Sequence, residues 1–298
     1  MSCASCHQPS KAFTDGLALS KTNQADKFTK RNTITLINAS FAHRFFYDMR
    51  TLNLERQVAH VINDTLEFNT DFWTIADKLN QNKTYVNLFE DAYQEVGAKK
   101  TINQQSISNA LAAYVNSLVA LNSPFDKYVR NEIPTYSAAA TRGFNLFMGK
   151  AACATCHFVP TFGGVVPPYY LESESEVLGM TIGLDTINPK LDLDLGKYAN
   201  GRRWDARPSY KNAFKTVSIR NVALTAPYMH NGTFDSLEEV LHFYNHGGGA
   251  GMGLPIENQT LSADPLQLSQ QEMSDIIVFM ESLTDTTGLD PGLVQLPK

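Results

Sequence analysis

Two short cysteine motifs constrain this chain more than any other feature. All four cysteines of the 298 residues lie in "CASCH", Cys3 to His7, and "CATCH", Cys153 to His157. Each motif places two thiols three positions apart and a histidine directly after the second. This spacing is typical of c-type haem attachment, because the thiols form thioethers with two vinyl groups of one porphyrin and the imidazole ligates its iron. The attachment residues we predict for two covalent haems are Cys3, Cys6, His7, Cys153, Cys156 and His157.

Other cysteine chemistries explain the motifs less well. A zinc site of four thiolates, a redox dithiol or disulfides would each use paired cysteines, but none requires a histidine directly after each pair. Haem attachment of this kind takes place outside the cytoplasm. We therefore expect a periplasmic or otherwise exported protein, and a leader that is absent from this chain.

Composition argues against a nucleic-acid partner and against a membrane-spanning segment. The formal net charge is -5 and no long run of like charge occurs, which argues against nucleic acid as a partner. No apolar stretch approaches the roughly 18 residues of a transmembrane helix. We expect no membrane-spanning segment.

The two halves of the chain resemble each other. "RNTITLINASFAHRFFYDMRTLNLERQVAHVIN" and "RNVALTAPYMHNGTFDSLEEVLHFYN" each contain an Arg-Asn pair, an apolar stretch, a histidine, and a Leu-Glu that begins a helical pattern. This similarity predicts an internal duplication, with the two Arg-Asn pairs as equivalent positions. The polar segment around Pro134 predicts a boundary between domains 1–134 and 135–298.

Helical periodicity dominates the remaining sequence. "AAATRGFNLFMGK" predicts a helix leading into the second cysteine motif. "QQSISNALAAYVNSLVAL" has apolar residues at positions 107, 111, 114, 115, 118 and 119. "SQQEMSDIIVFMESLTD" has them at 273, 276, 277, 280 and 283. Because sustained strand alternation is scarce, we expect a mainly all-α chain of two cytochrome c-like domains with long loops.

The sixth ligand of each iron decides between electron storage and chemistry, since an iron with an open face can bind peroxide. Between His7 and Arg31 there is neither histidine nor methionine, which predicts an open or water-bound first haem. His43 and His60 remain alternative ligands from later sequence.

The second iron has five candidate ligands: Met229, His230, His242, Tyr244 and His246. Asp235 and Glu238 have the spacing of a capping box, so a helix should follow Asp235 and end before Gly247. Tyr244 shares the apolar face of that helix with residues 237, 240 and 241, whereas the two histidines of the helix point away from it. Without further information, the simplest explanation of Tyr244 is a core side chain.

These motifs, together with "RNTITLINASF", "LTAPYMHNGTF" and "PIENQTL", resemble the bacterial diheme cytochrome c peroxidase superfamily, which includes the MauG enzymes. The resemblance covers nearly the whole chain. It implies that the N-terminal haem reacts with hydrogen peroxide and that the C-terminal haem transfers electrons.

The resemblance also assigns roles to individual positions. It implies that Gln57 is the active-site glutamine and that Glu67 is the catalytic glutamate, which moves a proton from one peroxide oxygen to the other. It further implies a calcium ion between the domains. The side chain of Asn32 and the carbonyls of Thr225 and Pro227 would bind it, because calcium prefers hard oxygen donors.

Three positions depart from the general family pattern. The position of the methionine ligand of the second haem falls on Tyr244, the replacement seen in the MauG-like branch, and Met229 is the rival ligand. The distal histidine of the first haem is missing, with Asn23 near its place. The tryptophan between the haems is replaced by Tyr47, which is either an electron relay or a packed aromatic side chain.

Three functions compete at this point. The first is a peroxidase that takes electrons from a small redox protein, either a cytochrome c or a cupredoxin. The second is a MauG-like enzyme that uses peroxide to oxidise residues of a partner protein. The third is a non-catalytic diheme electron carrier. Trp73 and Trp204 are candidate surface exit points for electrons or holes, and the acidic run "ESESE", Glu172 to Glu176, is a candidate dock for a basic donor.

Overall fold

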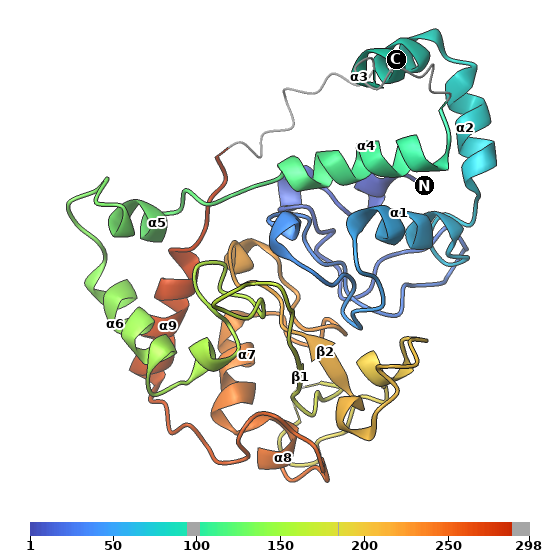
Figure 1. Cartoon of the computed structure of the whole chain (residues 1–298). Coiled ribbons are helices and arrows are strands. Elements are labelled where there is room, and N and C mark those ends of the chain that lie inside the picture. The colour runs from blue at the N-terminus through green and yellow to red at the C-terminus, as the bar shows by residue number, and fades with distance from the viewer. Residues whose placement is uncertain (94–101, 184, 288–298) are drawn as a thin grey trace.

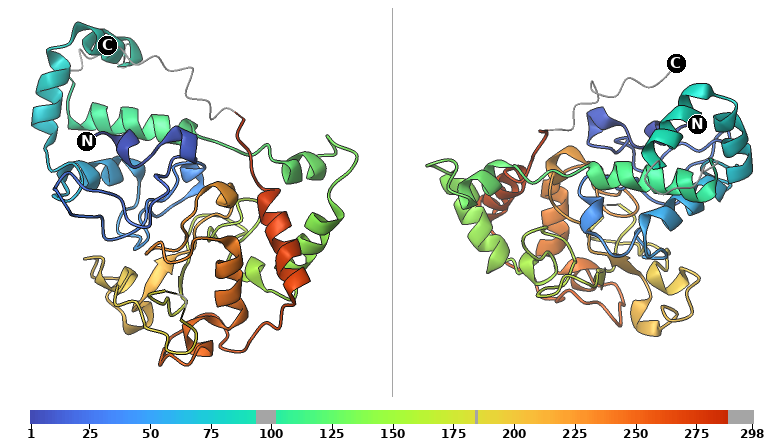
Figure 2. Two further views of the ribbon diagram at one scale, coloured as in Figure 1. Left: turned by 180° about the vertical axis from the view of Figure 1, so that it is seen from behind. Right: turned by 45° about the horizontal axis from the view of Figure 1, so that its top comes forward.

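The computed structural model describes residues 1–93, 102–183 and 185–287. The chain forms two helical regions with long loops, one carrying α1–α4 and the other α5–α9 (Figure 1), and the view from behind in Figure 2 shows the same division. The helices are α1 Leu54–Asn63, α2 Phe72–Asn80, α3 Lys83–Tyr93, α4 Gln104–Ser117, α5 Pro124–Val129, α6 Ala138–Met148, α7 Leu237–Asn245, α8 Gly248–Gly251 and α9 Gln270–Glu281.

Regular sheet is small in the described ranges. It consists of β1 Ser175–Val177 paired antiparallel with β2 Ala213–Lys215, with Glu176 opposite Phe214. In the same ranges, no helix is both long and apolar enough to cross a membrane.

Side-chain caps fix where the helices begin. The Ser269 hydroxyl accepts from the Glu272 amide at the start of α9, and the Ser269 amide donates back to the Glu272 carboxylate. The capping prediction for α7 was wrong by one residue, because Ser236 caps this helix and accepts from the Glu239 amide at 3.2 Å. The predicted helix end is confirmed, since α7 ends at Asn245, before the left-handed Gly247.

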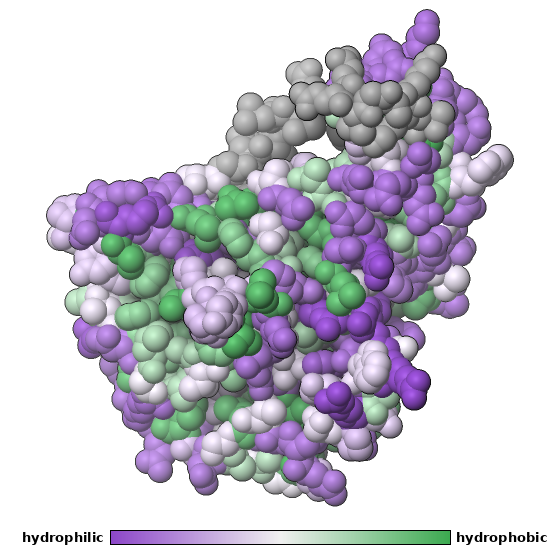
Figure 3. Space-filling view, viewed as in Figure 1, coloured by the Kyte–Doolittle hydropathy of each residue, from purple (hydrophilic) through white to green (hydrophobic). Residues whose placement is uncertain are grey.

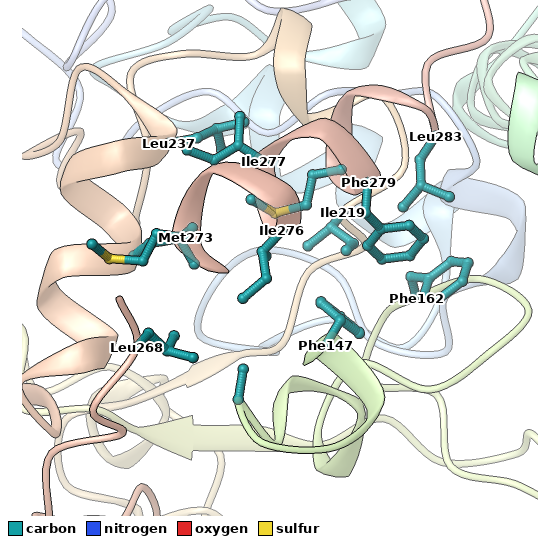
Figure 4. Close-up of a cluster of buried hydrophobic side chains, with 13 residues drawn as sticks. Phe147, Phe162, Ile219, Leu237, Leu268, Met273, Ile276, Ile277, Phe279 and Leu283 are labelled. Atoms are coloured by element: carbon teal, nitrogen blue, oxygen red, sulfur yellow. The ribbon is translucent and has the colours of Figure 1, made fainter. Parts of the chain in front are cut away.

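The larger core lies in the second region, between α6 and α9. Phe279 and Ile276 of α9 are fully buried against Phe147 and Phe162 (Figure 4). The two helices approach closely because position 143 is glycine, where a Cβ would lie 1.9 Å from the carbonyl oxygen of Asp275. The apolar positions predicted for this segment at 273, 276, 277, 280 and 283 are all buried, so its periodicity is confirmed.

The first region has three smaller clusters of buried side chains, and α1 packs on α4. Ile107 and Ala112 of α4 are buried, but Tyr114 and Val119 are 45% and 43% exposed. The apolar stripe predicted for this helix was therefore partly wrong. Residue 114 lies two turns after residue 107 on the same helical face, so the helical period does not explain the exposure of Tyr114.

The backbone repeats between the two halves, in a register that differs from the sequence prediction. Asn38 and Asn221 are both left-handed, each precedes a 3₁₀ turn, and each lies 16 residues before the first residue of a helix, Leu54 or Leu237. Asn221 therefore corresponds to Asn38 rather than to Asn32. Sequence matching aligned the two Arg-Asn pairs, but the left-handed conformation, which asparagine tolerates well, defines the equivalent position.

Several contacts join the halves. Arg31 forms a bidentate pair with Asp194 at 2.7 and 2.9 Å, and the Lys215 amide donates to the Tyr47 carbonyl at 2.7 Å. The helix α5 packs on the second core, because Asp126 accepts two 2.8 Å hydrogen bonds from the buried Arg220. The domain boundary near Pro134 stays a prediction.

Candidate active site

Both cysteine motifs adopt the same backbone. Each begins with a 3₁₀ turn, Cys3–Ser5 or Cys153–Thr155, and the histidine amide donates to the carbonyl of the first cysteine at 2.9 Å in both motifs. The turn holds the two thiols of a motif and its imidazole close together. None of the four cysteines forms a disulfide.

The histidines of the motifs are held for metal ligation. The Nδ1 atom of His7 lies 2.9 Å from the Phe13 carbonyl oxygen, and that of His157 lies 3.1 Å from the Phe162 carbonyl oxygen. Burial lowers the pKa of both imidazoles, which keeps them neutral. A neutral imidazole that donates from Nδ1 has its Nε2 lone pair free for a metal, the usual arrangement of a ligating histidine. Both motifs therefore fit a covalent haem.

A cavity of about 910 Å³ lies beside the first motif. Its lining brings together Cys6, His7, Gln57 and Glu67, which the sequence analysis assigned to the first haem, and Tyr47, which it placed between the two haems. The cavity is at the upper end of the usual range for sites of small molecules and cofactors.

The alternative ligands of the first iron lie elsewhere. His43 and His60 do not line the cavity, and both side chains are exposed. Asn23, near the expected place of the missing distal histidine, is also exposed and outside the lining. Among the described residues that line the cavity, His7 is the only histidine and there is no methionine.

Glu67 lines the cavity together with three aspartates, Asp48, Asp64 and Asp194. Burial raises its pKa to about 7, the nearby Asp64 carboxylate adds to the shift, and Arg50 opposes it. Glu67 follows α1 in a turn in which its amide donates to the Asp64 carbonyl at 3.2 Å. A carboxyl with a pKa near neutrality can both accept and return a proton at physiological pH.

Gln57 reaches the cavity from the first turn of α1. Asn53 caps this helix, its side chain accepting from the Arg56 amide at 2.9 Å and its carbonyl from the Gln57 amide at 3.1 Å. Gln57 carries both a carbonyl acceptor and an amide donor. It can therefore hydrogen-bond to a peroxide or a water molecule in the cavity.

Three polar groups of the wall were missed by the sequence analysis. The hydroxyls of Thr161 and Thr216 are buried without a hydrogen-bond partner, and Lys215 lines the same cavity. Burial lowers the pKa of Lys215 to about 8, and its ammonium bonds only to the Arg44 carbonyl at 3.3 Å in the described structure. Such donors suit the carboxylates of a bound haem. No local signal in the sequence distinguishes them from ordinary strand residues.

Tyr47 lies where the two halves meet. Its ring is edge-on to His230, with 6.4 Å between centroids, and His230 stacks on Phe214 at 3.5 Å. In the repeat register, Tyr47 and His230 are equivalent positions of the two halves. His230, a sequence candidate for the second iron, is buried with its Nε2 3.2 Å from Asp192 Oδ2. Burial keeps the pKa of the Tyr47 phenol above its usual range.

Tyr244 and Met229 contact the same cluster of buried side chains, which contains Met180, Phe234 and Phe243. The histidines His242 and His246 of this segment are exposed, as predicted. The buried residues of α7 include Phe243, whereas Tyr244 is half-buried at the edge of the predicted stripe.

The Tyr244 phenol lies within electrostatic range of the second motif. Burial raises its pKa above the usual range, and Cys153 and Cys156 add to the shift. A nearby iron cation would reverse this shift, because it favours the anionic form.

The predicted calcium ligands come from segments that meet. The Asn32 amide donates to the carbonyl of His230 at 2.7 Å, close in sequence to Thr225 and Pro227. The side-chain amide of Asn32 donates to the carbonyls of Leu17 and Ala18 at 2.9 and 3.3 Å, so its side-chain oxygen is left as an acceptor.

Comparison with known proteins agrees with this geometry. A family model described as di-haem cytochrome c peroxidase matches residues 1–133. The cytochrome-c peroxidase IdrP2 of Pseudomonas sp. (strain SCT) is 32% identical over 312 residues, covering 100% of this chain and 78% of the relative. The methylamine utilization protein MauG of Methylorubrum extorquens is 31% identical over 302 residues, covering 100% and 75%.

The fold is also that of solved relatives. The crystal structure of a MauG-like protein associated with microbial copper homeostasis superimposes with a TM-score of 0.81 at 24% identity, covering 98% of this chain and 86% of that one. The predicted fold class, two mainly helical cytochrome c-like domains, is confirmed. The chain thus belongs to the di-haem cytochrome c peroxidase and MauG family, and it is a diheme c-type oxidoreductase of the peroxidase class.

Proposed function

We propose that this chain reduces hydrogen peroxide in the cavity beside His7, with Glu67 as the proton-transfer group and Gln57 as the group that orients peroxide. Electrons reach this cavity through the second haem. The observation that carries the proposal is that a carboxyl with a pKa of about 7 lines the same cavity as the histidine of the first motif.

The haem supplies the redox chemistry when bound, since it provides the electrons that cleave the bond between the peroxide oxygens. Glu67, as the carboxylate, accepts the proton of one peroxide oxygen. As the acid, it returns that proton to the departing oxygen, which leaves as water rather than hydroxide. Gln57 holds peroxide within reach of Glu67 by hydrogen bonding. Reduction of one peroxide to two waters takes two electrons and two protons in all.

The reactive face beside His7 is open in this proposal. The absence of any second histidine and of methionine from the described cavity lining supports it. A protein with an open site reacts in its oxidised, as-isolated form, without prior reduction to remove a ligand.

Tyr244 is the proposed sixth ligand of the second iron, with Met229 as its rival. Support comes from the electrostatic effect of Cys153 and Cys156 on Tyr244, and from the family resemblance, which puts the ligand position at Tyr244. Anionic oxygen stabilises the oxidised iron, so a tyrosinate lowers the reduction potential relative to methionine.

Tyr47 is the proposed electron relay between the haems. Because its phenol stays neutral, loss of an electron from Tyr47 would be coupled to loss of a proton.

A second candidate function is the MauG-like oxidation of residues on a partner protein. Tyr244 in place of methionine and the open first site favour it.

The side chain of Asn32 and the carbonyls of Thr225 and Pro227 remain the proposed calcium ligands. The periplasm, typical of this family, remains the proposed location.

The central test is the reaction of the as-isolated ferric protein with hydrogen peroxide, followed in a stopped-flow spectrometer and by steady-state turnover with a reduced small redox protein. We expect a reaction without prior reduction. If the as-isolated ferric protein does not react with peroxide, and prior reduction does not restore the reaction, the catalytic proposal is overturned. Fast reaction without steady-state turnover of any small redox donor would favour oxidation of a protein partner.

The pH dependence gives an independent readout. Glu67 must start as the carboxylate, and its pKa in the folded protein is raised to about 7. We therefore expect kcat/KM to fall as pH decreases through about 7 and to level off above it. A profile that is flat between pH 5 and 8 would remove Glu67 from the proton-transfer role.

A further inference from the structure

The segment 201–211, "GRRWDARPSYK", carries basic and aromatic side chains on the surface. Arg203, Trp204, Arg207 and Lys211 are all exposed, and Trp204 is 72% exposed. We name these four residues the basic rim. Within the described structure, none of its three cations forms an ion pair within 4 Å. The segment projects beside β2 in Figure 1, and strongly hydrophilic side chains lie at that place in Figure 3.

The basic rim contrasts with the charge of the whole chain. The formal net charge is -5, yet three unpaired cations gather in nine residues around an exposed tryptophan. Asn258 packs on this segment through hydrogen bonds to the carbonyls of Ser209 and Lys211 at 3.0 and 3.2 Å. The exposed acid Glu257, next to Asn258 in the chain, offsets at most one of the three cations. The local excess of positive charge therefore remains.

The acidic run considered as a dock is much less available. Glu174 and Glu176 are half-buried, and Glu176 belongs to β1. The Glu174 amide donates to the Gly164 carbonyl at 2.7 Å, and burial raises the pKa of the Glu174 carboxyl. Only Glu172 of the three acids is exposed. The surface charge near β1 and β2 consequently favours an acidic partner over a basic one.

The segment 201–211, which carries the basic rim, is joined to the cavity wall by a hydrogen bond. Asp205, directly after Trp204, is 8% exposed and accepts from the Asn200 side-chain amide at 2.9 Å. The same amide group donates to the Asp48 carbonyl at 2.9 Å. Asn200 and Asp48 both line the cavity beside His7. The residue after Trp204 is thus hydrogen-bonded to a residue of the cavity lining.

We propose that the basic rim is the docking surface for an acidic redox protein that donates electrons, and that Trp204 is its central aromatic contact. Exposed Trp and Arg side chains are the residue types most enriched at energetically important interface positions. Complementary charge raises the association rate and makes it dependent on salt. Each donor gives one electron, so two donors are oxidised for each peroxide reduced. This inference rests on the proposed peroxidase function.

The test uses the diheme holoprotein with two reduced small c-type cytochromes, one acidic and one basic. The variant Arg203→Glu/Arg207→Glu/Lys211→Glu reverses three charges of the rim. The matched control, Lys21→Glu/Lys78→Glu/Lys83→Glu, reverses three exposed charges away from it. Binding of the acidic cytochrome is measured by titration, and kcat/KM is measured as a function of ionic strength.

For the acidic cytochrome at low ionic strength, we expect the rim variant to lose about tenfold or more in kcat/KM and in affinity. The control should lose much less. Trp204→Ala should weaken binding of the acidic cytochrome without changing its salt dependence. Equal losses in rim variant and control, or a wild-type protein that binds only the basic cytochrome, would overturn the proposal.

A small neutral reductant, hydroquinone, separates this proposal from the function on which it rests. Peroxide turnover with hydroquinone should be the same in wild type and rim variant. If the wild-type protein shows no peroxide turnover with hydroquinone, the peroxidase proposal fails. The binding titration with the acidic cytochrome still tests the docking surface in that case. If the rim variant oxidises the acidic cytochrome normally but no longer modifies an acidic protein in the presence of peroxide, the rim serves a protein substrate, and the donor assignment is wrong.

Discussion

The two haem-binding halves share a backbone pattern but differ in what surrounds it. Beside His7 there is a cavity of about 910 Å³ with a carboxyl whose pKa is about 7. Beside the second motif, Tyr244 and Met229 contact a cluster of buried aromatic and sulfur-containing side chains. The halves also differ in their cores, since one large cluster around α6 and α9 contrasts with three small clusters around α1 and α4.

This difference teaches how a duplicated fold separates chemistry from electron transfer. Chemistry needs space for a substrate and a group that can exchange protons. Electron transfer needs an iron with fixed ligands in a packed environment. The first half has such a cavity and carboxyl, and its core clusters are smaller. Under the proposed function, the second half holds the electron-transfer haem.

The largest expected effect comes from removing the proton-transfer group of the first half. Glu67→Gln should lower peroxide turnover by roughly 10² to 10⁴-fold, because general acid–base catalysis contributes about that much. Steady-state kinetics measure the loss, and the haem absorbance checks that both haems stay attached. The matched control is Glu55→Gln, a glutamate of α1 that does not line the cavity. Retained turnover in Glu67→Gln would break the contrast between the halves.

The second test compares the two cores. Phe279→Ala in α9 removes a fully buried ring that contacts four other aromatic rings, and should cost about 3–5 kcal/mol of unfolding free energy. Phe72→Ala in the first half should cost no more than the lower end of that range, because Phe72 belongs to a smaller cluster. Denaturant unfolding of the holoprotein measures both. A larger loss for Phe72→Ala would reverse the ranking of the cores.

The third test concerns the ligand of the second iron. Tyr244→Met should raise the reduction potential of this haem, by some part of the roughly 0.8 V that axial ligands span. Met229→Leu serves as the control and should leave the potential and the ferric electron paramagnetic resonance spectrum unchanged. The opposite pattern, a shift in Met229→Leu alone, would make Met229 the ligand and weaken the MauG-like alternative.

The smallest expected effect concerns Gln57. Gln57→Ala should lower kcat/KM for peroxide by about tenfold or less, since one neutral hydrogen bond contributes about 1 kcal/mol. The fall in kcat/KM as pH decreases through about 7 should persist in this variant, because Glu67 is unchanged. If that fall disappears in Gln57→Ala, the two residues act as one unit and their separate roles are wrong.

Some of this could be predicted from the sequence because the relevant chemistry is local. The thiols and histidine of each motif lie within five residues, so their spacing alone indicates haem attachment. Helices α6 and α9 were also predictable, since their apolar faces follow the helical period. The register of the repeat was predicted wrongly, because left-handed backbone at Asn38 and Asn221 defines it and the Arg-Asn pairs do not.

By itself, the sequence determined the number of haems, the helical class and the doubling of the chain, because each depends on covalent spacing or on periodicity within one segment. Only the tertiary structure decided that Glu67 has a pKa near 7, that Lys215 enters the wall of the first cavity, and that the basic rim is exposed while Glu174 and Glu176 of the acidic run are half-buried. These properties depend on burial, and burial is set by residues far apart in the chain.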